Sequence, residues 1–160
     1  MIINNNSIVQ DQELENDNLS GFTSSTRPTV YSPYVLVGST WTDGNGGPNL
    51  GANRASNIII LFSESMDPSS ITVNTSGSSC SGTIQVSAIS ENFASCVQMS
   101  SSPSASNNNK TFTVDPNGCL ANGGSYKIRV TTGVKDGSGY SMSNNYTTGT
   151  GFGTNKSSCP

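Results

Sequence analysis

The 160-residue sequence contains no histidine, and only 11% of its residues are charged. Without histidine, neither a Ser-His-Asp triad nor a typical Cys/His zinc site can form. The seven Lys and Arg residues are scattered and the formal net charge is −3, whereas binding to phosphates needs clustered basic residues. We therefore expect a protein that is not an enzyme and has no nucleic-acid partner.

Long apolar runs are also missing. No segment approaches the roughly 20 apolar residues that a transmembrane helix requires. The first residues lack the basic-then-apolar pattern of a signal peptide, so we expect either a mature form or export by a route without that signal. Only 32% of the residues are hydrophobic. Abundant Ser, Thr, Asn and Gly favour turns and strands over helices, which predicts an all-β chain with many loops.

The cysteine pattern predicts disulfide bonds. The four cysteines are Cys80, Cys96, Cys119 and Cys159, an even number without a CxxC pair. A Cys80–Cys96 bridge would close a loop of about 15 residues and contribute about 3 kcal/mol in the chain-entropy model. Cys119 and Cys159 would then pair by elimination. The alternative is that Cys159 forms a bond with another chain.

Residues 1–26 have the composition of an N-terminal arm or tail. Their apolar positions are Ile2, Ile3, Ile8 and Val9. Four acids follow on every second residue, which would place them on one face of an extended strand: Asp11, Glu13, Glu15 and Asp17. One interpretation is a solvated, mobile tail. The other is an assembly arm that pairs with the sheet edge of a neighbouring subunit.

Residues 27–160 show short β-prone runs separated by turn clusters, the pattern of a β-sandwich. The predicted strands are 29–31, 57–62, 71–74, 83–87, 96–99, 111–114, 125–131 and 151–154. Alternation predicts that Tyr126, Ile128 and Val130 point inward, and Lys127 and Arg129 outward. The run 58–62 does not alternate, which suits a central strand covered on both faces or one partly hidden by an added segment.

A long loop is predicted from Gly38 to Ala55. It contains the only tryptophan, Trp41, in a glycine-rich context, and loops are where sandwiches commonly carry recognition. Asp43 and Asn45 of this loop could supply hard oxygen ligands to calcium, although the glutamate of a full calcium loop is missing. No other cofactor is expected.

The segment Ile60–Ile71 resembles the FSE-MDP-S-I signature of bacterial Ig-like domains of S-layer and other surface proteins. Segments 112–116, 126–130, 133–136 and 151–154 resemble later strands of that family in the same order. The resemblance covers residues 28–154 and implies a Greek-key sandwich of about seven strands on a bacterial cell surface, with roles in spacing, display and adhesion. The chain departs from the pattern in the 38–55 loop, the Cys80–Cys96 insertion and the acidic N-terminus.

The same motif residues also have a structural interpretation. Asp67 can cap a short helix whose first turn contains Pro68, with Met66 closing one end of the sandwich beneath it. Asp136, followed by Gly137 and Gly139, is typical of a turn in which the carboxylate accepts hydrogen bonds from backbone amides. We therefore expect Glu64, Asp67 and Asp136 to be structural.

Two functional hypotheses follow. The first is an extracellular structural subunit that polymerises into a fibre or surface layer by donating its N-terminal strand to a neighbouring copy, with copies of itself or other surface proteins as partners. The alternative is a monomeric adhesion module that recognises a glycan or a host protein through the 38–55 loop.

Overall fold

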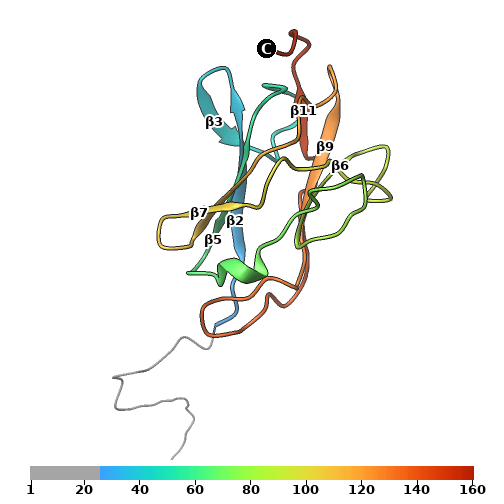
Figure 1. The fold of residues 1–160 in the computed structure, drawn as a ribbon. Coiled ribbons are helices and arrows are strands. Elements are labelled where there is room, and N and C mark those ends of the chain that lie inside the picture. The colour runs from blue at the N-terminus through green and yellow to red at the C-terminus, as the bar shows by residue number, and fades with distance from the viewer. Residues whose placement is uncertain (1–25) are drawn as a thin grey trace, which may run out of the picture.

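The structure, a computed structural model, describes residues 26–160 and consists of two facing β-sheets (Figure 1). The first sheet has the order β3-β2-β5-β8-β7. Its strands are β2 (Val30–Val37), β3 (Thr40–Asp43), β5 (Ile58–Phe62), β7 (Ser104–Ser106) and β8 (Thr111–Val114). The second sheet contains β4 (Gly47–Ala52), β6 (Ile84–Ala88), β9 (Ser125–Val130), β10 (Tyr146–Thr147) and β11 (Phe152–Thr154). The predicted all-β sandwich is confirmed.

The first sheet contributes alternate residues to the core. In β5, the side chains of Ile58, Ile60 and Phe62 are completely buried, and those of Phe112 and Val114 in β8 are almost so. The β5–β8 register pairs Ile58 with Val114 and Ile60 with Phe112, so these rows interdigitate on the inner face. The rings of Phe62 and Phe112 meet edge to face with centroids 5.9 Å apart, a favoured geometry for an aromatic pair.

The second sheet is organised around β9. One edge of β9 pairs along its length with β6, and other pairings connect it to β10 and β11. The predicted orientation is confirmed, because Ile128 and Val130 are completely buried and Tyr126 nearly so, whereas Lys127 and Arg129 alternate with them. β11 also pairs in parallel with β4, which brings residues of the 38–55 segment into this sheet.

The order of the strands is that of a Greek-key sandwich. β2, β5, β8 and β7 occupy the places of strands A, B, E and D of the immunoglobulin arrangement, and β6, β9 and β11 those of C, F and G. β3 and β4 are additions between the first two of these strands. The prediction of a loop over 38–55 is therefore wrong for much of this segment. β2 and β3 form a hairpin, and β4 joins the second sheet.

Two other predicted strands are wrong. Segments 71–74 and 96–99 contain only isolated bridges, Val73 with Gly82 and Met99 with Pro116. Both segments are anchored by separate backbone hydrogen bonds that do not form a ladder, such as that from the Val97 N–H to the Val86 carbonyl. Their β-prone residues therefore serve packing, since Met99 is completely buried without belonging to a ladder.

The motif after β5 forms the predicted cap. Asp67 is the N-cap of the 3-10 helix η1 (Pro68–Ser70), and its Oδ1 accepts a hydrogen bond of 2.9 Å from the Ser69 N–H. Met66 is 1% exposed beneath this turn. η1 is the only helix within residues 26–160, so the described part of the chain has no helix that could cross a bilayer.

Candidate functional site

Five apolar side chains lie on the outer surface of the first sheet. The register places Tyr34 opposite Ile59 and Leu36 opposite Trp41, and Leu61 follows Ile59 on the same side of β5. Because successive strand residues point to opposite faces, these side chains face away from the buried row in β5. Trp41 is 46% exposed, and the other four are half-buried. We call these five residues the outer apolar face.

The outer apolar face borders a sheet edge. Within residues 26–160, β3 pairs only with β2, so its other side is an open edge. Contiguous apolar patches and unpaired strand edges are both typical of surfaces that bind another chain. β5 is the predicted central strand, and Ile59 and Leu61 on its outer side are only half-buried. The arrangement is suited to accept an added strand beside β3 together with apolar side chains that extend over the face.

Asp43 and Asn45 lie at the end of β3, where they hold two loops together. The Asp43 Oδ1 accepts a hydrogen bond from the Asn45 N–H at 2.9 Å. The Asn45 Oδ1 accepts from the backbone N–H groups of Thr150 and Gly151 at 2.9 and 3.0 Å. Asn45 was predicted as a calcium ligand, but its Oδ1 accepts hydrogen bonds from the segment that connects β10 and β11. No group of three or more Cys, Asp or Glu side chains suited to a metal ion occurs within residues 26–160.

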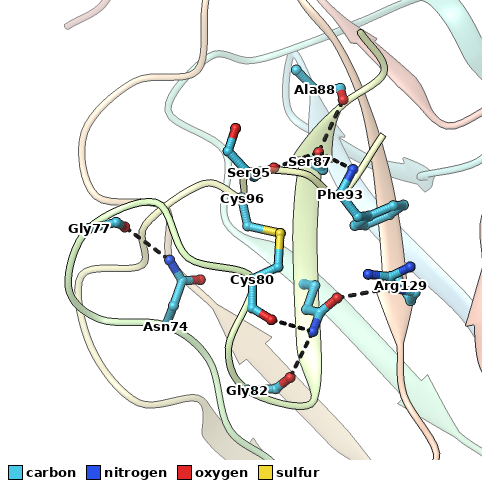
Figure 2. Close-up of a disulfide and its surroundings, with 11 residues drawn as sticks. Asn74, Gly77, Cys80, Gly82, Ser87, Ala88, Phe93, Ser95, Cys96 and Arg129 are labelled. Carbon is cyan, nitrogen blue, oxygen red and sulfur yellow. Dashed lines mark hydrogen bonds between the residues drawn. A yellow bond between two sulfur atoms is a disulfide. The ribbon is translucent and has the colours of Figure 1, made fainter. Parts of the chain in front are cut away.

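The Cys80–Cys96 disulfide closes a segment that folds over β6. The two Cα atoms are 5.0 Å apart, and the bridged loop covers the outer side of this strand (Figure 2). As a result, Gln85 and Ser87, which alternate with the core residues of β6, are themselves buried, at 6% and 0% exposure. The insertion thus gives β6 a second covered face.

The polar side chains of Gln85 and Ser87 beneath this insertion are hydrogen-bonded. Gln85 donates through Nε2 to the carbonyl oxygens of Cys80 and Gly82, and its Oε1 accepts from Arg129 Nε at 2.9 Å. The Arg129 guanidinium also lies 4.0 Å from the centroid of the Phe93 ring, a cation–π contact (Figure 2). The network therefore fastens the inserted loop to both β6 and β9.

The second bridge joins Cys119 to Cys159, with Cα atoms 6.3 Å apart. It attaches the last residues of the chain to the turn before β9. Arg54 supports the same place by donating from Nε to the Leu120 carbonyl and from Nη1 to the Ser157 carbonyl, each at 2.9 Å. Both pairings considered from the cysteine pattern are present in the structure.

Residues 1–25 of the predicted assembly arm lie outside the described residues, and so do its apolar positions Ile2, Ile3, Ile8 and Val9. Tyr34 and Leu36 were not predicted as site residues. The signal that could have identified them is the Gly38-Ser39 pair between two β-prone runs, which is typical of a two-residue hairpin turn. Gly38 has a φ of 61°, a conformation suited to glycine in such a turn.

Three comparisons place the chain among known proteins. Residues 25–154 match the family model described as a bacterial Ig-like domain. A structure of domains 1–6 of the surface layer protein SbsC aligns with a TM-score of 0.53 and 17% identity, over 84% of this chain and 14% of that one. The crystal structure of the N-terminal part of the bacterial S-layer protein SbsC aligns with a TM-score of 0.52 and 16% identity, over 84% of this chain and 25% of that one. No curated protein matches this chain.

The structural likenesses concern the fold, because their sequence identities are low, and this chain spans only a small part of the length of each. The family model, in contrast, covers most of the sequence, including the residues 60–71 that carry the signature. The chain belongs to the family of bacterial Ig-like domains.

Proposed function

We propose that this chain is an extracellular structural subunit of a bacterial surface, in which residues 27–160 form the domain and residues 1–26 form an assembly arm. Membership of the bacterial Ig-like family and a fold shared with a surface layer protein support a structural role at the cell surface. In this proposal, the apolar start of one copy pairs with the open edge of β3 in the next copy.

The outer apolar face carries this proposal. Its five side chains leave apolar area exposed to water, and each 100 Å² of such area that a partner covers contributes about 2.5 kcal/mol. An added strand would gain main-chain hydrogen bonds along the β3 edge and would place alternate side chains next to Trp41. Ile2, Ile3, Ile8 and Val9 have the apolar character that this position requires.

The length of the connecting segment is compatible with exchange between copies. Residues 10–25 separate the apolar positions from Thr26, where the described chain begins. In extended form, these 16 residues span about 50 Å, at roughly 3.3 Å per residue. The β2 strand, with its eight residues, is about half as long. The apolar segment can therefore reach the face of an adjacent molecule.

Deleting residues 1–26 should convert the protein from polymers to monomers. The deletion removes the donated strand and leaves the two sheets intact, so circular dichroism should still report a folded β-protein. Multi-angle light scattering on the full and shortened chains, at equal concentration, measures the difference. Polymers of unchanged size after the deletion would contradict the proposed assembly.

A matched pair of full-length variants separates the apolar contacts from the presence of an arm. In the first, Ile2, Ile3, Ile8 and Val9 are each replaced by Ser, which should abolish assembly. In the second, Asp11, Glu13, Glu15 and Asp17 are replaced by Asn or Gln, which should leave polymers because the apolar positions are retained. If both variants polymerise equally, the apolar positions do not drive assembly.

A second candidate function is supported by the exposure of Trp41. A tryptophan that is 46% exposed on a strand next to Tyr34 and Leu36 offers a rigid apolar platform on which a sugar ring or a protein side chain could pack. In that case the chain would be a monomeric binding module that recognises a glycan or a host protein. A full chain that remains monomeric in light scattering would favour this candidate.

A further inference from the structure

A pair of carboxyl groups lies at the end of the sandwich where the described chain begins. Glu64 follows β5, Asp136 lies in the loop after β9, and Thr26 precedes β2, so three segments distant in sequence meet here. The Thr26 hydroxyl donates to the Glu64 Oε1 at 3.2 Å. Met66 and Asp136 form a β-bridge, and the Gly137 N–H donates to the Ser65 carbonyl, which fixes the two loops against each other.

Asp136 is buried, but only one of its carboxylate oxygens is satisfied. Its side chain is 2% exposed. Oδ1 accepts hydrogen bonds from the backbone N–H groups of Ser138 and Tyr140, both at 2.8 Å, as predicted for this turn. Oδ2 is buried and receives no hydrogen bond from an N–H or hydroxyl group of residues 26–160. A buried carboxylate oxygen without a partner is costly and requires an explanation.

The group within reach of Asp136 is a second acid. The side chains of Glu64 and Asp136 interact, and each affects the pKa of the other. Burial raises the pKa of Glu64, and the interaction with Asp136 raises it further. Burial would also raise the pKa of Asp136, but the Tyr140 N–H, the interaction with the Glu64 side chain and the Ser138 N–H lower it overall.

Positive side chains compensate little of the negative charge of this carboxyl pair. Lys110 acts on Glu64 through its charge and lowers its pKa, but only as the smallest of the contributions. Within residues 26–160, no Lys or Arg forms an ion pair with Glu64 or Asp136. Two facing carboxylates at neutral pH need either a shared proton or a cation between them.

We propose that Glu64, Asp136 and the Thr26 hydroxyl bind one divalent cation, of which calcium has the fitting chemistry. All the donors are oxygens, which calcium prefers, whereas zinc and copper favour nitrogen or sulfur. The four cysteines are engaged in disulfides, so no soft ligand is free within the described residues. Water can complete the six to eight ligands of calcium, and a site with two carboxylates suits the millimolar calcium of extracellular fluids.

The cation would fasten the start of β2 to the loops after β5 and β9. This site shares no residue with the outer apolar face, whose Leu36 and Trp41 lie in the β2–β3 hairpin at the opposite end of β2 (Figure 1). The inference does not require assembly, and its test uses the full chain because Thr26, one of the donors, is the last residue of the proposed arm. Its expected effect is on the stability of the domain, because a ligand that binds only the folded state raises the melting temperature.

Calcium binding to the full chain, after treatment with EDTA and dialysis, tests the proposal. Isothermal titration calorimetry should detect one site per chain, with a Kd of about 0.1 to 1 mM. Calcium at ten times its Kd should raise the melting temperature by about 4 °C. In Glu64→Gln, the affinity should fall at least tenfold. This variant is the primary test, because Glu64 is only half-buried and its replacement is neutral and similar in shape.

Asp67→Asn is the matched control, because Asp67 is a nearby acid that accepts hydrogen bonds from its own turn. Its calcium affinity and the rise in melting temperature should be those of the unmodified chain. Equal binding by the unmodified chain and Glu64→Gln would overturn the proposal and place any bound ion elsewhere, for example on the acids at 11–17. Absence of calcium binding by the unmodified chain would also overturn it, in favour of a proton shared by the two carboxyl groups.

Discussion

Replacing Gly153 with alanine is expected to lower the free energy of unfolding by about 3 kcal/mol or more. Gly153 is the middle residue of β11, between β9 on one side and β4 on the other. A Cβ atom at this position would overlap the carbonyl oxygen of Pro48 in β4. Because the obstacle is backbone, it cannot rotate away as a side chain would, and the parallel pairing of β4 with β11 must open.

Gly149→Ala is the control for this variant. Gly149 lies in the connection between β10 and β11, and a Cβ there would meet no atom within 4 Å. Its effect should stay within about 0.5 kcal/mol. Urea unfolding followed by tryptophan fluorescence measures both variants, with the reporter Trp41 in the neighbouring hairpin. Similar stabilities for the two would mean that β4 and β11 are not packed as closely as described.

Removing the Cys80–Cys96 bridge by replacing both residues with Ser should lower the free energy of unfolding by about 3 kcal/mol. The bridge spans 16 positions and holds the inserted segment over β6. Without it, the segment can lift away and expose Gln85 and Ser87 to water. The free energy of unfolding should fall, and limited proteolysis should cut first within residues 75–99.

The second bridge provides the comparison. Replacing Cys119 and Cys159 with Ser should also lower stability, because this bridge closes a longer segment, with a separation of 40 positions. Early cleavage should then occur near the C-terminal end, around residues 155–160, and not in the insertion. Early cleavage within 75–99 in this second variant, but not in the first, would show that the insertion does not depend on its own disulfide.

The sequence motifs with a local physical cause predicted their structures well. The Asp67 cap, the Asp136 turn and the alternation in β9 all depend on residues close together in the chain, and each is present in the structure. The central position of β5 was also predictable from its composition. Its outer side, however, is not fully covered within the described residues, because Ile59 and Leu61 are only half-buried.

The 38–55 segment could not be predicted from local patterns. Its glycines and asparagines indicated a loop. This prediction was wrong because the strands of the segment are stabilised by residues distant in the sequence. β4 contains Gly47, Pro48 and Gly51, poor strand formers, but it pairs with β11, about 100 residues later in the chain. Asn45 is likewise fixed by Thr150 and Gly151. Long-range pairing thus determined both this part of the fold and the site next to Trp41.

The most direct test of the account is to locate the apolar N-terminal segment in the assembled protein. The photoreactive residue p-benzoylphenylalanine is introduced at Trp41, and after irradiation the cross-linked peptides are identified by mass spectrometry. The account predicts cross-links to residues 2–9 within covalent dimers and larger products. Cross-links to residues 2–9 found only within single chains, or none to that segment in polymers, would contradict it.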